Sequence, residues 1–223
     1  MIASAILILL TVSALYAQTD QKAKAILNNV SKKYRSFDAI KTEFRFILDN
    51  PQKNVKNFTQ TGTIIVKPNQ NKFHIDLYEG LGKQKKVGQE IVSDGKTQWT
   101  YTRVDNEIQV NNEENTTATI NPAQIFTIYE KGYKYLYEGP AKVAGNTYEV
   151  IQLTPEDSQK SIFKIRLQIN KAKSLIYSAT LFDKGGNKYT YIIDSDATNY
   201  KGSDAIFTLN PKNFPGAEVV DLR

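Results

Sequence analysis

Hydrophobic side chains recur at intervals of three and four residues between Asp20 and Ser36. The apolar positions of this segment are Ala23, Ile26, Leu27, Val30 and Tyr34. Lysines occupy positions between them, and Thr19 or Asp20 can cap the first turn. This spacing predicts an amphipathic helix, and such a helix must lie with one side against an apolar surface.

After this segment the hydrophobic period changes to two, which is typical of strands. Thr42, Phe44, Phe46 and Leu48 alternate with Lys41, Glu43 and Arg45. Further strand-like runs cover residues 60–67, 72–78, 90–93, 97–102, 107–110, 133–138, 147–154, 162–169, 175–182 and 188–194. An Asp94-Gly95 turn joins two of these runs, because Asp-Gly favours a two-residue hairpin loop. Asn121-Pro122 predicts a second short helix that runs to Gly132, since Asn suits the cap and Pro the first turn.

These runs predict a mainly β protein of the α+β class, with one antiparallel sheet of about eleven strands. A sheet this wide is not expected to stay flat, because strand twist accumulates. We expect it to curl into a barrel, a partial barrel or a sandwich, with the helices against its concave side. Two alternate rows are unusually apolar: Phe163, Ile165, Leu167 and Ile169, and Tyr189, Tyr191 and Ile193. Ordinary core packing and a ligand-lined cavity would both explain these rows.

Residues 2–16 form an apolar run without a charged side chain, and Ala17 precedes a polar stretch. The run is short for a membrane span, so it predicts a signal peptide, residues 1–17, that is cleaved after Ala17. Residues 18–223 are expected to form one domain, because no linker or low-complexity tract divides them. An uncleaved amino-terminal anchor is the alternative interpretation of residues 1–17.

Composition and charge exclude several classes of chemistry. The chain contains no cysteine, which excludes disulfides, zinc–thiolate sites and thiol nucleophiles. Its formal net charge is +6, but the lysines are scattered and no RNA-binding signature accompanies them. We expect a solvated basic surface and no nucleic-acid partner, with weak attraction to anionic lipid headgroups as the alternative.

The sequence offers little support for catalysis. Its single histidine, His74, lies within a strand-like run between Phe73 and Ile75. No second histidine is present to share a metal ion, and no nucleophile-elbow or phosphate-loop motif occurs. The segment Asp194–Asp196 could bind a hard cation, although such residues at a strand end more often hydrogen-bond a turn. We therefore expect a protein that is not an enzyme and that binds no metal and no cofactor.

The segment Ile91–Tyr101, with the sequence IVSDGKTQWTY, resembles the signature hairpin of the periplasmic outer-membrane lipoprotein carrier family. Other segments are similar to that family in the same order: Phe37–Phe46, Gly62–Pro68, Leu153–Pro155, residues 162–169, and Phe207–Pro211 with Val219 and Asp221. The resemblance covers nearly all of the chain after residue 17. Two positions depart from it, because Phe46 stands where the family usually has Gln, and Lys67 stands before Pro68 where the family commonly has Arg.

The resemblance implies an incomplete β-barrel with a helical lid over an apolar cavity. It implies a monomeric carrier in the periplasm that binds the acyl chains of lipoproteins and ferries them from the inner to the outer membrane. The implied partners are an inner-membrane lipoprotein-releasing transporter and an outer-membrane receptor. Gating by the family's arginine is not carried over, because Lys67 replaces it. A periplasmic binding protein for a free lipid, glycolipid or other apolar ligand is the alternative, since the same cavity would serve both.

We expect apolar side chains of one parity on each strand to line the acyl-chain cavity. The expected cavity residues are Phe44, Phe46, Ile65, Trp99, Tyr101, Phe163, Ile165 and Leu167. The expected lid residues are Ile26, Leu27, Val30, Ile125 and Phe126. The inward parity rests on apolarity alone, and a slip of one residue would move a whole strand's side chains to the other face.

Overall fold

The computed structural model describes residues 20–80, 85–112, 122–195 and 197–223. These residues form a mainly β protein with one 13-stranded sheet and an α-helix over residues 20–35. Within these ranges no helix has the length and apolar character needed to cross a membrane. The predicted signal peptide, residues 1–17, lies outside the described residues.

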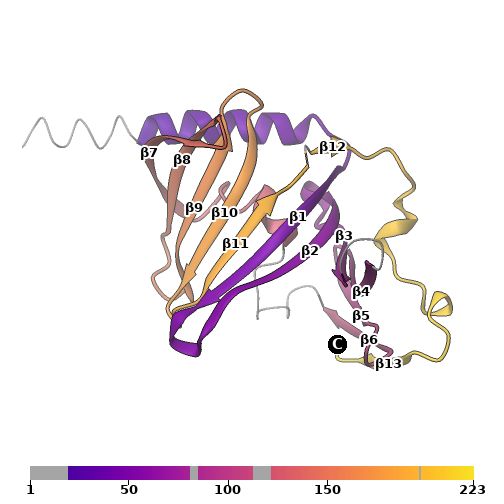
Figure 1. The fold of residues 1–223 in the computed structure, drawn as a ribbon. Coiled ribbons are helices and arrows are strands. Elements are labelled where there is room, and N and C mark those ends of the chain that lie inside the picture. Colours follow the sequence, from indigo (N-terminus) through magenta and orange to yellow (C-terminus); the bar gives the residue numbers. More distant parts are fainter. Residues whose placement is uncertain (1–19, 81–84, 113–121, 196) are drawn as a thin grey trace, which may run out of the picture.

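The sheet has the strand order β13-β6-β5-β4-β3-β2-β1-β11-β10-β9-β8-β7, and β12 pairs with β1 (Figure 1). Its strands are β1 (Ile40–Asn50), β2 (Val55–Lys67), β3 (Lys72–Glu79), β4 (Lys86–Asp94), β5 (Thr97–Thr102), β6 (Glu107–Asn112), β7 (Tyr133–Val143), β8 (Asn146–Pro155), β9 (Ile162–Asn170), β10 (Leu175–Asp183), β11 (Lys188–Ile193), β12 (Thr198–Asn199) and β13 (Glu218–Asp221). Neighbouring strands are antiparallel, except that β13 and β6 are parallel. The sheet is open, with β7 and β13 as its edge strands.

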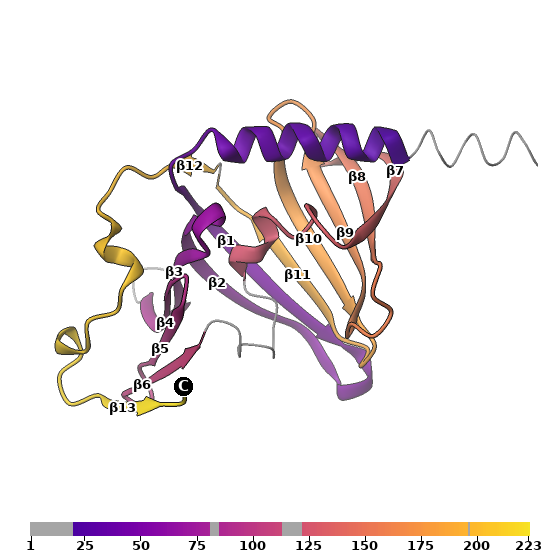
Figure 2. The same cartoon turned by 180° about the vertical axis from the view of Figure 1, so that it is seen from behind.

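The N-terminal helix, residues 20–35, lies across one side of the sheet over β7 to β11 (Figures 1 and 2). Its buried apolar side chains are Ala23, Leu27, Val30 and Tyr34. They belong to one core cluster with sheet residues such as Ile151 and Leu153, and with the 3-10 turn η5 (Pro122–Phe126). We call the side of the sheet that carries this cluster the helix-covered face.

Residues 200–223 cover the opposite face of β3–β6, and we call them the C-terminal cover. They contain the 3-10 turns η6 (Asp204–Phe207) and η7 (Pro211–Asn213), and they end in β13. A second core cluster lies beneath them and consists of Val92, Ile108, Val110 and Leu209, with Trp99, Tyr101, Phe214 and Ala217 packed against it. On β4, Ile91 packs against the first cluster and Val92 belongs to the second. This part of the sheet is therefore buried on both faces.

The structure confirms the mainly β class, the single and mostly antiparallel sheet, and the helix that begins near residue 20. It also confirms the hairpin between β4 and β5. There Gly95 has a φ of +93°, which favours glycine. The Asp94 carboxylate accepts hydrogen bonds from the backbone N–H groups of Lys96 (2.9 Å) and Thr97 (2.8 Å).

The expected second α-helix is wrong for the part of residues 121–132 that is described. Only the 3-10 turn η5 forms there, and further turns follow it. Apolar side chains that are buried in the first cluster or pack against it come from Ala123, Ile125, Phe126, Ile128 and Tyr129. A regular helix would point these side chains to all of its sides, whereas the observed turns direct them to one core.

The sheet is neither closed nor strongly curled, in contrast to the expected barrel-like shape. The two covers explain how its apolar rows are buried without closure. The helix covers one face near β7–β11, and the C-terminal cover lies on the other face at β3–β6. No enclosed interior is needed for burial.

The contact between Phe44 and Gly62 sets how closely β1 and β2 pack. These residues are opposite each other in the ladder, and a Cβ at Gly62 would lie 2.7 Å from the Phe44 ring and 2.6 Å from the Asp76 carbonyl oxygen. We expect Gly62→Ala to lower the free energy of unfolding by about 1–3 kcal/mol in urea titrations, because the ring must move. Gly185→Ala is the control, since its Cβ would meet no atom closer than 3.4 Å. Equal effects of the two substitutions would contradict a special role for this contact.

Candidate functional site

The helix-covered face is an apolar surface that one helix shields from water. The side of the helix that faces the sheet is apolar. Ala23 and Val30 on this side are 0% exposed, and Leu27 is 4% exposed. Beneath it, Leu153 and Leu167 of the sheet are also 0% exposed. Burial of aliphatic groups stabilises this arrangement by about 25 cal/mol per Å² of apolar surface and has no directional requirement. Such a surface can bind an apolar ligand without a specific polar contact.

Buried tyrosines place neutral hydroxyl groups in this region. The Tyr34 hydroxyl accepts a hydrogen bond from the backbone N–H of Ile176 (3.0 Å), which fastens the helix to β10. Burial raises the pKa values of Tyr34, Tyr129 and Tyr191 above their ordinary range, so all three stay uncharged at neutral pH. The Tyr129 hydroxyl is buried and has no hydrogen-bond partner among the described residues. The region therefore suits an uncharged ligand.

A groove of about 570 Å³ runs between the helix and the segment that leads into β7. Its lining includes Leu27, Ser31, Arg35, Tyr129, Glu130 and Tyr135. The Ser31 hydroxyl donates a hydrogen bond to the Glu130 carboxylate at 2.7 Å, and Arg35 forms an ion pair with the same carboxylate at 3.2 Å. The Arg35 side chain is 62% exposed, so this ion pair contributes little to stability. Apolar contacts are thus the main force that holds the helix down.

All of the predicted lid residues and half of the predicted cavity residues meet on the helix-covered face. Leu27, Val30, Ile125 and Phe126 are buried in the first cluster, and Ile26 packs against it. Phe44, Ile165 and Leu167 are also buried in this cluster, and Phe46 packs against it. The Phe46 ring lies 5.1 Å from the Tyr191 ring, measured between centroids. Binding of acyl chains by these residues stays a prediction.

Ile65, Trp99 and Tyr101 lie on the opposite face of the sheet. Trp99 and Tyr101 pack against the second cluster, where the Tyr101 and Phe214 ring centroids are 4.3 Å apart. Ile65 follows Ile64, which is buried in the first cluster, so Ile65 points the other way. The structure therefore corrects the inward parity that was expected for β2 and β5. These three residues share a surface with the C-terminal cover and not with the helix.

Phe163 also leaves the expected cavity lining, although it continues the apolar row of β9. The ladder with β10 pairs Lys164 with Phe182 and Ile162 with Asp183, which leaves Phe163 as an unpaired bulge residue. The bulge turns Ile162 toward the first cluster. Phe163 packs instead near Phe182, at 6.5 Å between ring centroids, and is 46% exposed.

Sequence reasoning missed several side chains that do face the helix-covered side. They are Ile64, Val66, Phe73, Ile75 and Ile91, all in or against the first cluster. The available signal was the polar character of the other parity, where His74, Asp76 and Glu90 alternate with them. A strand with charged residues on one parity turns its apolar parity to the core.

Comparison with known proteins connects this arrangement to one family. The family model described as "Outer membrane lipoprotein carrier protein LolA" matches residues 35–210. Comparison with curated proteins finds no match.

Solved structures with the same fold have little sequence identity to this chain. An uncharacterized conserved protein of Thermus thermophilus is 15% identical with a TM-score of 0.54, and the match covers 90% of this chain and 99% of that one. A domain of Vibrio parahaemolyticus described as a putative outer membrane lipoprotein-sorting protein domain is 11% identical with a TM-score of 0.50, and the match covers 84% and 97% of the two chains. At these identities the likeness shows the fold alone.

The hydrogen bond from Ile176 to Tyr34 gives a test of how the helix is fastened. Tyr34→Phe leaves a buried backbone N–H unpaired, so we expect a loss of about 1–3 kcal/mol in the free energy of unfolding. Hydrogen exchange of residues 20–35 should also become faster. Tyr177→Phe is the control, because the Tyr177 side chain is only half-buried and stacks on Tyr148 through its ring. Unchanged exchange in Tyr34→Phe would contradict a fastening role.

Proposed function

The chain belongs to the family of the outer membrane lipoprotein carrier protein LolA, and from this premise we propose that it carries the acyl chains of a lipidated protein on its helix-covered face. One observation carries the proposal: a single amphipathic helix, held mainly by apolar contacts, shields an apolar sheet face from water. Because these contacts are not directional, an acyl chain can replace the helix without loss of hydrogen bonds other than the few at its end.

The energetic need for such a carrier is large. Moving one methylene group from an apolar environment into water costs about 0.8 kcal/mol, so a palmitoyl chain costs on the order of 10 kcal/mol. An acyl chain has no hydrogen-bonding groups by which it could be recognised. A carrier must therefore offer an apolar, shape-tolerant surface, which the aliphatic side chains and uncharged tyrosines of the helix-covered face supply.

We propose that the N-terminal helix is the lid over the helix-covered face of the sheet. In the described state the sheet residues beneath the helix are fully buried, with Ile151 and Ile165 at 0% exposure. An acyl chain can reach them only when the helix moves away. The bonds of Ser31 and Arg35 to Glu130 lie at the groove and must open during this motion.

Transport also requires a donor and an acceptor. We propose a periplasmic location, an inner-membrane lipoprotein-releasing transporter as donor, and an outer-membrane receptor as acceptor, in line with the family. Lys67 pairs with Asp204 of the C-terminal cover, so its charge is already engaged on the face away from the helix. Opening of the lid then depends on the partner proteins or the ligand rather than on this residue.

A lid and an ordinary core helix respond differently to loss of a buried side chain. Leu27→Ala weakens only the closed state, so we expect a lower free energy of unfolding, by about 2–5 kcal/mol, and at least about tenfold tighter binding of a fluorescent palmitate analogue. Leu209→Ala is the matched control, because Leu209 is equally buried beneath the C-terminal cover. It should lower stability without changing the affinity. Tighter binding in neither variant, or in both, would contradict the lid assignment.

The cargo is tested by native mass spectrometry of the protein isolated gently from its own periplasm, with lipid extraction alongside. We expect a bound triacylated protein that detergent releases, because detergent micelles compete for the acyl chains. Free lipid alone would overturn carriage of lipoproteins and favour a lipid-binding protein. A protein without any ligand, even when lipoproteins are abundant, would overturn both.

A further inference from the structure

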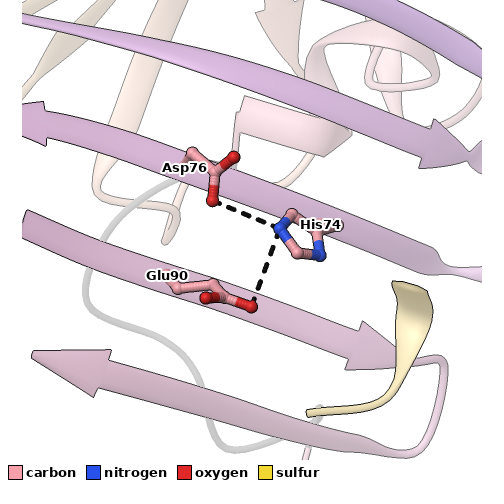
Figure 3. Close-up of side chains that lie close together, drawn as sticks. All are labelled: His74, Asp76 and Glu90. Carbon is pink, nitrogen blue, oxygen red and sulfur yellow. Dashed lines mark hydrogen bonds and ion pairs between the residues drawn. The ribbon is translucent and has the colours of Figure 1, made fainter. Parts of the chain in front are cut away.

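Three metal-ligating side chains meet on the face of β3 and β4 that lies away from the helix (Figure 3). His74 and Asp76 are two residues apart on β3 and so point to the same side. Glu90 lies directly opposite Asp76 in the ladder with β4. The His74 Nε2 atom is 3.2 Å from Asp76 Oδ1 and 3.7 Å from Glu90 Oε1. One ligand atom from each residue lies within 4.8 Å of the others.

The C-terminal cover fixes the orientation of the imidazole. His74 Nδ1 lies 2.9 Å from the carbonyl oxygen of Ile206, in η6. A carbonyl oxygen only accepts hydrogen bonds, so Nδ1 carries the proton and donates it. This leaves Nε2 to face the two carboxylates, as Figure 3 shows. Histidines that bind metals are usually held in this way, with one ring nitrogen donating to a carbonyl or carboxylate and the other on the metal.

The cluster has more negative than positive charge. Asp76 and Glu90 lie side by side, and in the described part of the chain His74 is the one basic side chain within 4 Å of either carboxylate. Even a charged imidazole would leave one negative charge without a counterpart. The three side chains are 20–26% exposed, so they are partly shielded but still accessible to an ion from solvent. A divalent cation would supply the missing positive charge.

Two of the three ligand-atom distances are close to those around a tetrahedral ion. A tetrahedral ion with bonds of 2.0–2.2 Å separates its ligand atoms by roughly 3.3–3.6 Å, and the two distances from His74 Nε2 fall on either side of this range. One imidazole nitrogen and two carboxylate oxygens suit Zn²⁺ or Mn²⁺ better than Ca²⁺, which prefers six or more oxygens.

We propose that His74, Asp76 and Glu90 form a binding site for a divalent transition-metal ion, with Zn²⁺ as the best fit and water in the remaining position. The ion binds to His74 Nε2 and to one oxygen of each carboxylate. Because the Ile206 carbonyl holds the same imidazole, metal binding also stabilises the docking of the C-terminal cover on β3 and β4. The site lies on the opposite face from the proposed acyl-binding surface and does not depend on it.

The sequence did not predict this metal site, because the chain has no second histidine that could share a metal ion with His74. The additional ligands are carboxylates, and one of them comes from a neighbouring strand. Their proximity depends on the register that pairs Asp76 with Glu90, which spacing along the chain does not reveal.

The test is titration of the chelator-treated full-length mature protein with Zn²⁺ alone, by calorimetry, and with Co²⁺, by visible absorption. We expect one Zn²⁺ ion to bind per protein molecule and to raise the thermal unfolding midpoint. Bound Co²⁺ should give an absorption spectrum typical of four-coordinate N/O ligation. His74→Gln and Glu90→Gln should each weaken binding by at least about tenfold, because each removes one of three ligands. Glu90→Gln also relieves the repulsion with Asp76, so the metal-free variant should unfold at the same or a higher temperature.

Glu138→Gln serves as the control, since Glu138 is a partly exposed carboxylate that pairs with Arg166 away from this cluster. It should leave the Zn²⁺ affinity unchanged. Binding weaker than about 1 mM, or equal binding by the wild type and Glu90→Gln, would overturn the proposal and leave a hydrogen-bonded His–Asp pair. Because both readouts use the metal alone, failure here has no bearing on acyl-chain carriage.

Discussion

Successive side chains of a strand point to opposite faces of a sheet, so a sheet that is apolar on both faces needs two covers. This constraint shapes the whole protein. On β4, Ile91 turns toward the helix and Val92 toward the C-terminal cover. The two covers come from the two ends of the described chain, since the helix precedes β1 and residues 200–223 follow β12. Between them the strands form two antiparallel meanders, β1–β6 and β7–β11, which meet where β1 pairs with β11. Each face is therefore completed by its own segment, and the two can serve different functions.

The covers differ in how they are attached. The C-terminal cover joins the sheet itself, because β13 pairs with β6, and the backbone of Ile206 bonds to His74. The helix adds no strand, and its side chains contact the sheet mainly through apolar groups, with Tyr34 as a hydrogen-bonded anchor. Backbone ladders require fixed register, whereas apolar contacts tolerate exchange. Under the proposed function the helix is thus the cover that an apolar ligand displaces, and the C-terminal segment is the permanent one.

The sequence was sufficient for the elements with a clear period or a strong turn signal. The helix after Asp20, the Asp94-Gly95 hairpin and the positions of most strands along the chain could be predicted, and the hairpin also indicated the family. The order of the strands in the sheet could not, because β1 pairs with β11, which lies far away in the sequence. It was harder to predict which face of the sheet each side chain points to. Ile64 and Ile65 are both isoleucines, so apolarity cannot decide which points inward. At Phe163 a β-bulge interrupts the alternation of side chains between the two faces. The bulge depends on pairing with β10 rather than on local sequence.

Lys67 shows how the two covers stay independent where they come closest. It stands at the end of β2, and with Tyr34 and Phe126 it lines a small pocket of about 60 Å³ beside the end of the helix. Its ammonium group, however, pairs with Asp204 and lies over the Phe207 ring, 5.8 Å from the centroid, both in the C-terminal cover. An ammonium group is a compact charge without the planar fork by which arginine binds two partners at once. Its charge therefore serves the permanent cover, and the helix can leave its face without breaking that ion pair.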